Sequence, residues 1–358
     1  LVAQERSQPR ATKMLNRGEY NLPLGEALTP GVPEILNRFP EGAPRNRLGL
    51  AKWMTSREQP LVSRVLVNRV WQRVFGHGLV RTPEDFGVQG EQPTHPRLLD
   101  WLAVELQESQ WNLKHVLRLM VHSQTFKQDS RWREGLNDPE NRLFARGQNY
   151  RMDAEMLRDV ALWASGLLVP AKGGEGAKPY QPKGMWAALM HPGSNTKNYV
   201  QDKGDRLYRR SIYTYWKRTS PHPMMTLFDA PDRESSCVKR SRSNTALQSL
   251  GLLNETQRIE MSRKLAERLL SLKVDDGKRL DYLFGLLACR KPSDTEKKTC
   301  MNLLQKMDRR YGGSEKDAVA LLGSGDALRD DSYPTGKLAA WTQLAATVLA
   351  SDIAILVY

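Results

Sequence analysis

Imidazole, carboxylate and guanidinium side chains gather in residues 68–87 (NRVWQRVFGHGLVRTPEDFG), where an amphipathic helical pattern runs into a glycine-rich turn. His77 lies between two glycines, Asp85 follows it, and His95 comes shortly afterwards. A histidine whose ring is oriented by a carboxylate is the usual arrangement for general acid–base catalysis. The sequence therefore makes His77, Asp85 and His95 candidate catalytic residues of a polar cleft.

The same residues have a structural interpretation. A histidine between glycines is often a turn residue, and an aspartate in a loop often accepts from backbone N–H groups at a helix start. Arginines such as Arg64 and Arg81 can bridge turns to neighbouring helices. The sequence leaves both interpretations open.

A second stretch, residues 208–234, interleaves aromatic rings with cations and ends in three carboxylates. Aromatic rings beside cations suit stacking on sugars or binding of an anionic ligand. Two carboxylates about 5 to 10 Å apart would suit glycosidic chemistry, and the alternative is a salt-bridged loop packed on a helical body. The candidate ligand-binding residues here are Arg210, Tyr213, Trp216, Arg218, His222, Asp229 and Arg233.

A third candidate is the short stretch RSRSNT at residues 240–245. Asn244 or Ser243 is expected to cap the helix that follows, and a helix N-terminus flanked by arginines attracts phosphate, sulfate or carboxylate. Arg240, Arg242 and Asn244 are therefore further candidate ligand-binding residues. The alternative is a clamp in which the arginines hold a carboxylate of the preceding loop.

Metal and cofactor motifs are not recognisable in this chain. The histidines form no H-x-x-x-H or H-x-H pair, and there is no phosphate loop, nucleophile elbow or dinucleotide fingerprint. The cysteines are Cys237, Cys289 and Cys300, with no C-x-x-C-H motif for haem attachment. Cys289 and Cys300 can meet across a helical hairpin, bridged or free, and Cys237 is expected to be a small buried residue.

Apolar residues recur at helical spacing through most of the chain, and these elements must position the candidate residues. Pro96 marks a helix start, Asp153 is expected to cap the helix after it, and Gly312 with Gly313 marks a helix end. The expected helices span 47–56, 61–75, 96–106, 113–123, 154–168, 244–252, 255–272, 277–289, 294–311 and 336–350.

The fold class expected from this pattern is mainly α, a multi-helical body with a loop-rich central segment and room for one small β-sheet. Residues 1–45 are expected to form an extended N-terminal arm and residues 46–170 a helical subdomain. Residues 171–243 are expected to be loop-rich, with a short strand at 208–216, and residues 244–358 to form helical hairpins.

The chain of 358 residues carries a formal net charge of +14, which favours an anionic partner such as nucleic acid, an acidic protein or an acidic polysaccharide. Nucleic acid is not expected, because no zinc-finger spacing or RNA-binding aromatic motif accompanies the charge. No apolar run is long enough to predict a membrane span. The chain begins at Leu1 without an initiator methionine, so we expect it to be part of a longer protein.

Several long motifs together resemble one family. Besides residues 68–87, they are NRLGLAKWM (46–54), PTHPRLLDWLA (93–103), YRRSIYTYWKRTSPHPMMTLFDAPDRE (208–234) and RSRSNTALQSLGLLN (240–254). The chain resembles the planctomycete-specific family catalogued as domain of unknown function 1553, from about residue 46 to about residue 349. Its last residues, LASDIAILVY, differ from the acidic ending expected of many members.

The resemblance implies a large exported protein in which this domain accompanies a companion domain and a planctomycete cytochrome c domain. It therefore implies a periplasmic or otherwise extracytoplasmic location. Haem c would lie in an upstream or partner domain, and this chain itself would hold no cofactor.

We accordingly expect a domain of a cytochrome c-associated protein that takes part in oxidation or processing of an external substrate such as a polysaccharide. The alternative is a non-catalytic scaffold or binding module for an anionic glycan or a partner domain. Charges that are mutually paired would favour the alternative, because paired buried charges mainly fix geometry.

Overall fold

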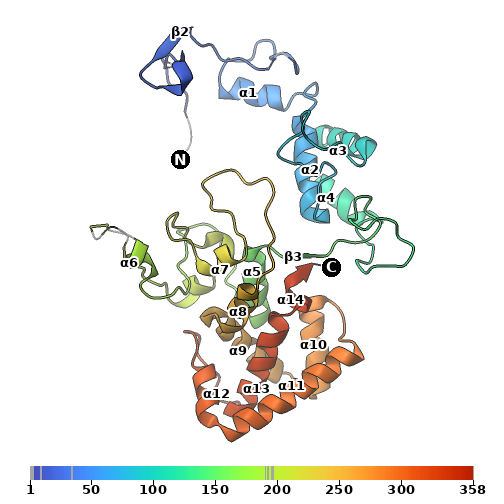
Figure 1. Cartoon of the computed structure of the whole chain (residues 1–358), viewed down its shortest axis with the longest axis vertical. Helices are drawn as coiled ribbons and strands as arrows, with labels where there is room; N and C mark the ends of the chain where they lie inside the picture. Colours follow the sequence, from blue (N-terminus) through green and yellow to red (C-terminus); the bar gives the residue numbers. More distant parts are fainter. Residues whose placement is uncertain are drawn as a thin grey trace. The chain divides into compact units, whose positions relative to one another are not determined.

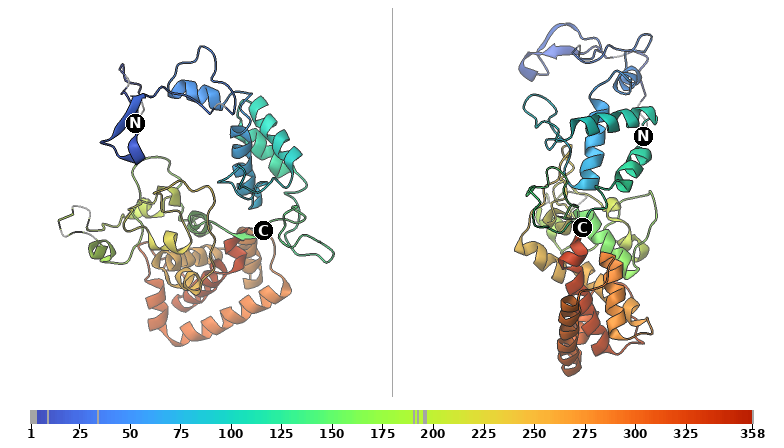
Figure 2. Two further views of the ribbon diagram at one scale, coloured as in Figure 1. Left: turned by 45° about the horizontal axis from the view of Figure 1, so that its top comes forward. Right: turned by 90° about the vertical axis from the view of Figure 1, so that its right-hand side faces the viewer.

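The structure, a computed structural model, describes residues 4–8, 10–33, 35–189, 191, 193–194 and 197–357. The chain divides into two compact units, Leu1–Gln148 and Asn149–Tyr358 (Figures 1 and 2). The predicted fold class is confirmed, because helices dominate and the described residues contain only two small two-stranded sheets. No helix among them is long and apolar enough to cross a membrane.

The first unit places three helices around an aromatic core. Trp71 stacks on Phe75 with ring centroids 4.0 Å apart, and Phe144 meets Trp71 edge-on at 5.3 Å. The N-terminal arm, expected to be extended, contains an antiparallel hairpin whose strand residues are all exposed. The elements are β1 (Lys13–Leu15), η1 (Asn16–Gly18), β2 (Pro23–Ala27), α1 (Arg47–Met54), α2 (Val62–Phe75), α3 (Pro96–Glu108) and α4 (Leu113–His122).

The second unit contains the remaining elements, including the helix expected at 154–168. They are β3 (Tyr150–Arg151), α5 (Ala154–Ser165), α6 (Met185–Leu189), η2 (Gly204–Tyr208), η3 (Ser211–Tyr213), α7 (Pro223–Leu227), α8 (Ala246–Asn254), α9 (Thr256–Leu270), α10 (Asp276–Ala288), α11 (Asp294–Gly313), α12 (Glu315–Leu322), α13 (Thr335–Leu349), α14 (Asp352–Ile355) and β4 (Leu356–Val357). Strands β3 and β4 pair antiparallel, so the start of this unit lies against its end.

Helices α9 and α13 form the centre of the second unit, and α5, α10, α11 and α12 surround them (Figure 1). Helix α13 is apolar on nearly every side, as expected of a helix enclosed by others. Helix α9 is different, because it is buried almost throughout although more than half of its residues are polar or charged. Its Arg258, Glu260 and Arg263 are each 4% exposed or less.

The strand expected at 208–216 is wrong, because this segment forms the short turns η2 and η3 with isolated bridges. Side chains of α5 take the place of a neighbouring strand. Arg158 donates to the carbonyls of Leu207 at 2.7 Å and Arg209 at 2.9 Å. Asp159 accepts from the Ser211 N–H at 2.7 Å, so the backbone is satisfied without a ladder.

Two predicted helix caps also need correction. Thr245, not Asn244 or Ser243, caps α8, and it forms a capping box with Gln248. Asp153 occupies the cap position of α5, but its carboxylate makes no cap hydrogen bond and faces Arg240 at 3.5 Å.

All three cysteines are free thiols. Cys289 and Cys300 are therefore not bridged. Cys237, expected to be buried, is exposed, and its thiol donates to the Lys239 carbonyl at 3.2 Å.

Candidate functional site

Asp229 lies at the centre of a network of paired charges in the second unit. Its backbone is left-handed, with φ of 60°, which a non-glycine residue keeps only where its neighbours impose it. Arg151 donates to its carboxylate at 2.6 Å, and Ser243 donates through its N–H and its hydroxyl, each at 2.8 Å. The carboxylate thus ties β3 to the stretch before α8.

Arg240 and Arg242 extend this network to the start of α5. Arg240 donates to both oxygens of Glu155, at 2.6 and 3.2 Å, and lies 3.5 Å from Asp153. Burial opposes ionisation of Glu155, but hydrogen bonds from Arg240 leave its pKa below the usual value. Arg242 lies 3.9 Å from Asp153 and over the ring of Tyr150 at 4.2 Å.

Trp216 and the residues after Asp229 form a more exposed part of the site. The Trp216 indole donates to the Asp232 carbonyl at 2.7 Å, and Arg233 lies over its ring at 4.6 Å. Arg233 also has a left-handed backbone, with φ of 65°. Glu234 pairs with Arg218 at 3.1 Å, so this predicted cation and predicted carboxylate face each other.

Of three other predicted ligand residues, Arg210 and Tyr213 have structural contacts. Arg210 pairs with Asp159 at 3.2 Å. The Tyr213 hydroxyl accepts from the Gly173 N–H at 3.1 Å, and its ring supports Arg209 at 4.2 Å. Asn244 is exposed, immediately before the cap of α8.

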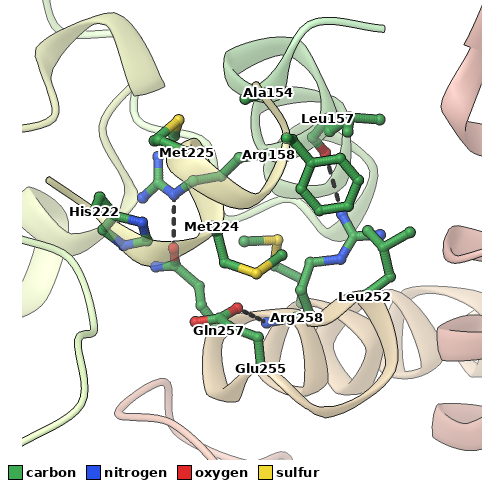
Figure 3. A pocket seen from close by; sticks show the side chains of 12 residues that line it. Ala154, Leu157, Arg158, His222, Met224, Met225, Leu252, Glu255, Gln257 and Arg258 are labelled. Atoms are coloured by element: carbon green, nitrogen blue, oxygen red, sulfur yellow. Dashed lines mark hydrogen bonds between the residues drawn. The ribbon is translucent and has the colours of Figure 1, made fainter. Parts of the chain in front are cut away.

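His222 lies apart from these charges and lines a buried cavity (Figure 3). Its Nε2–H donates to the Tyr180 carbonyl at 3.0 Å, whereas its buried Nδ1 has no hydrogen-bond partner. Burial, together with the positive charge of Arg158, lowers the pKa of His222 to about 4. His222 is therefore a neutral imidazole with an unused acceptor.

The cavity measures about 20 Å³, which is room for roughly one water molecule. Its polar lining consists of Arg158, His222, Glu255, Gln257 and Arg258, and the rest is apolar, mainly methionine and leucine side chains (Figure 3). Arg158 donates to Gln257 at 2.7 Å. Burial raises the pKa of Glu255 and lowers that of Arg258 to about 10. These groups could hold or move one proton, but the space admits no sugar ring.

In the first unit, the stretch NRVWQRVFGHGLVRTPEDFG is organised by Asn68. This buried side chain on α2 donates to the Val80 carbonyl at 3.0 Å and accepts from its N–H at 2.9 Å. A Cβ on Gly78 would lie 2.4 Å from the Val80 carbonyl oxygen and 2.7 Å from the Asn68 amide. The glycine is therefore required by the close approach of the turn to the helix.

The predicted catalytic residues lie along the chain that leaves this turn. His77 is exposed in the turn itself. Asp85 accepts from the Gly87 N–H at 2.7 Å and so closes a loop. His95 precedes α3, and its Nδ1 lies 2.9 Å from the Thr94 hydroxyl. None of these contacts joins the three residues to one another.

An open groove of about 600 Å³ adjoins Thr94 in the same unit. The cation Arg81 pairs at its edge with Glu140 at 3.0 Å, and Arg142 pairs with Glu91 at 2.8 Å. The Asp138 carboxylate accepts from two backbone N–H groups, at 2.7 and 2.8 Å. Charges in this region therefore mainly hold the groove's own loop in place.

Comparison with protein families gives one match. The family model of PSD1, described as "Protein of unknown function (DUF1553)", matches residues 46–304. The chain belongs to this family. Comparisons with curated proteins and with solved structures give no match.

The part shared with the PSD1 family contains every candidate described above. It covers the Asn68 turn of the first unit, the Asp229 network and the His222 cavity. It ends within α11, so the matched part excludes the exposed N-terminal hairpin and the helices α12 to α14.

The sequence did not reveal Arg158, Glu255, Gln257 or Arg258 as site residues. Arg158 lies within the apolar helix AEMLRDVALWAS, and this charge on an apolar face was the one available signal. The α9 residues lie in a charge-rich sequence that is typical of an exposed helix. Gln257 and Arg258 are held by contacts with distant segments, Gln257 with Arg158 and Leu207 and Arg258 with Leu157 and Leu349, which no local pattern predicts.

Within the described residues, no three histidine, cysteine, aspartate or glutamate side chains gather as a metal would require.

Proposed function

We propose that this domain is a binding module of an extracytoplasmic, cytochrome c-associated protein, and that it holds an anionic partner or substrate for processing elsewhere in that protein. The proposed contact surface is the arginine–aromatic surface, defined here as Tyr150, Trp216, Arg233 and Arg242. The periplasmic location, the companion domain and the haem c of a neighbouring domain rest on the family resemblance.

The binding proposal rests on one observation. In this region the carboxylates accept from the protein's own donors, whereas two arginines lie over aromatic rings. Asp229 accepts from Arg151 and Ser243, Asp232 accepts from the Glu234 N–H at 2.9 Å, and Glu234 pairs with Arg218. These carboxylates are ill suited to glycosidic catalysis, because each is already a partner of the protein's own groups. The guanidiniums of Arg233 and Arg242 instead lie over aromatic rings, at 4.6 and 4.2 Å from the ring centroids, and Arg242 is also 3.9 Å from Asp153.

Such stacked guanidiniums keep edges available for planar anions. A guanidinium on an aromatic face retains in-plane N–H donors that can bind carboxylate or sulfate. The net charge of +14 attracts any polyanion nonspecifically, so specific binding must depend on the aromatic rings as well.

Binding of polygalacturonate and dextran sulfate, measured by titration calorimetry near physiological salt, tests the proposal. We expect Trp216→Ala with Arg233→Ala to weaken binding by about tenfold or more, since ring and cation act together. Arg310→Ala is the matched control, because Arg310 lies over Tyr311 at 5.3 Å on α11, outside the surface. Equal affinities for all three proteins would show nonspecific charge attraction and refute the proposal.

A second candidate function is proton transfer at the His222 cavity, in an oxidation or processing reaction within this chain. It is favoured by the unpaired Nδ1 of His222, in a cavity that Glu255 also lines. A cytochrome c reduction assay on the intact protein with a polysaccharide substrate tests it. The rate should fall at least about a hundredfold in His222→Gln if a proton of the reaction passes through His222. An unchanged rate would exclude this role.

A further inference from the structure

Helix α8 has an unusual surface for a helix of a highly charged chain. Residues 244–254 carry no charged side chain, although charged residues make up 26% of the sequence. Leu247 is 64% exposed, Leu250 56% and Leu253 37%. The opposite face is buried, because Gln248 and Leu252 are each 4% exposed. The leucines therefore form an apolar ridge on an anchored helix.

The spacing of the ridge matches the packing of one helix on another. Leu247, Leu250 and Leu253 form a row three residues apart, about 9 Å long. Such rows fit between the rows of residues four apart on a partner helix, which is the geometry of most helix pairs in bundles and coiled coils. The ridge is too narrow for a lipid surface to gain much, since membrane-binding helices present a broad apolar face.

The charge beside the ridge indicates what kind of helix it accepts. The long loop between α7 and α8 (Figure 1) leads directly into the ridge and is exposed over most of residues 232–245. Residues 232–245 of this loop contain four cations and two carboxylates, Asp232 and Glu234. The cations are Arg233, Lys239, Arg240 and Arg242. Arg240 pairs with Glu155, so Arg233, Lys239 and Arg242 are the cations most able to meet a partner.

We propose that the leucine ridge of α8 and the basic loop before it are a docking site for an acidic amphipathic helix of a partner protein. This inference rests on the proposed binding function and specifies its partner. Leucines have no favourable contact with an anionic glycan, whereas a protein helix offers leucines and carboxylates on adjacent faces. Leucine contacts contribute affinity and the cations contribute orientation and association rate.

The test uses a fluorescein-labelled peptide of about 18 residues, or five helical turns, with leucines at every third or fourth position and glutamates elsewhere. A peptide of the same composition in scrambled order has equal charge and no apolar face. Fluorescence anisotropy near physiological salt compares the two, with reducing agent present because Cys237 is exposed. We expect the amphipathic peptide to bind about tenfold or more tightly than the scrambled one.

Two protein variants locate the site. Leu247→Gln with Leu250→Gln should abolish the preference for the amphipathic peptide. Leu113→Gln with Leu117→Gln is the matched control, because these α4 leucines are 42% and 38% exposed, and it should leave the preference intact. Equal binding of both peptides, or a preference that survives the α8 substitutions, would overturn the docking site.

Further measurements separate this inference from the proposed function. If polygalacturonate binds in a manner dependent on Trp216 and Arg233 while neither peptide does, the binding function stands and the helix partner is wrong. If nothing anionic binds specifically, both fail. Ridge-dependent binding to phosphatidylglycerol vesicles without peptide binding would instead indicate a membrane surface. Ridge-dependent self-association in sedimentation, again without peptide binding, would indicate a second copy. Either outcome overturns the inference.

Discussion

Two groups of arginines in the second unit, an inner and an outer one, differ in burial and in the groups to which they donate. The inner group, Arg158 and Arg258, is 7% and 4% exposed and donates mainly to main-chain carbonyls. The outer group, Arg240 and Arg242, faces the carboxylates of Asp153 and Glu155 near the surface. A carbonyl fixed by the fold has no alternative donor, whereas a surface carboxylate exchanges partners readily. The inner arginines therefore specify the fold, and the outer ones remain able to meet a ligand.

The largest expected effect comes from removing an inner arginine. Arg258 donates to the carbonyls of Leu157 at 3.1 Å and Leu349 at 2.7 Å, and so joins α5, α9 and α13. Arg258→Met should lower the free energy of unfolding by about 3 to 5 kcal/mol, because both carbonyls lose their donor inside the protein. Urea denaturation at neutral pH measures this loss. A loss no larger than that of Arg240→Met would erase the distinction between the two groups.

The next effect concerns the neutral histidine beside the inner group. The pKa of His222 is about 4 in the folded chain and near 6.5 when unfolded, so the unfolded state binds the extra proton. The stability from His222 is therefore fully present above pH 6.5 and is lost as the pH falls toward 4. The loss should reach roughly 3 kcal/mol near pH 4. Glu255, whose pKa is raised by burial, acts in the opposite direction.

The measurement compares urea denaturation of the wild type and His222→Gln at several pH values between 7 and 4. Glutamine keeps a donor for the Tyr180 carbonyl but does not titrate. The difference in unfolding free energy between the two proteins should shrink as the pH falls. A constant difference would show that His222 titrates alike in both states.

The first two predictions concern Arg258 and His222, and the sequence analysis named only His222 as a candidate site residue. Local periodicity was sufficient for the helices around Trp71 and for the start of α3 at Pro96, because it reports which face of a helix is buried. His222 was predicted as a ligand-binding residue from its place among aromatic and charged neighbours, and that role stays a prediction. The contact with Tyr180 that makes it a buried neutral group joins distant segments, and no local pattern encodes it.

The failures have the same physical origin. The 208–216 segment alternates like a strand, but Arg158 and Asp159 of a distant helix satisfy its backbone instead. Asp229 stays a predicted ligand-binding residue, but its contacts with Arg151 and Ser243 likewise come from other segments of the chain and were not foreseen. Composition gives the kinds of residue in the site, whereas their partners are set by tertiary contacts.

A third prediction concerns the carboxylate of Glu260, which is buried like the inner arginines. Glu260 accepts from the Tyr180 and Tyr208 hydroxyls at 3.0 and 2.9 Å and from the Ala327 N–H at 2.6 Å. Gly325 approaches it so closely that a Cβ would lie 2.5 Å from the carboxylate, at a backbone φ of 86°. Gly325→Ala should therefore cost about 2 to 3 kcal/mol, from strain and overpacking together.

The control for this prediction is Gly285→Ala on α10, where a Cβ would meet nothing within 4 Å. There the substitution should raise the free energy of unfolding by up to about 1 kcal/mol, through helix propensity. Thermal unfolding of both variants gives opposite signs if the Glu260 centre is as tightly enclosed as described. Two changes of the same sign would argue that it is not.

The smallest effect is expected in the outer group. The strength of its Arg240–Glu155 ion pair decides whether the carboxylate of a ligand can displace Glu155. Arg240 and Glu155 side chains are 20% and 21% exposed, and the pair is bidentate. A double-mutant cycle with Arg240→Gln and Glu155→Gln should give a coupling of about 1 kcal/mol, typical of a partly exposed pair. Raising the salt from roughly 0.05 to 0.5 M should reduce the coupling, since water and ions reach the pair.

The contrary result is a coupling above about 3 kcal/mol that does not change with salt. It would show that Arg240 stabilises the fold as strongly as the buried arginines do. A partner's carboxylates could then not displace Glu155, and docking would depend on Arg233, Lys239 and Arg242 alone.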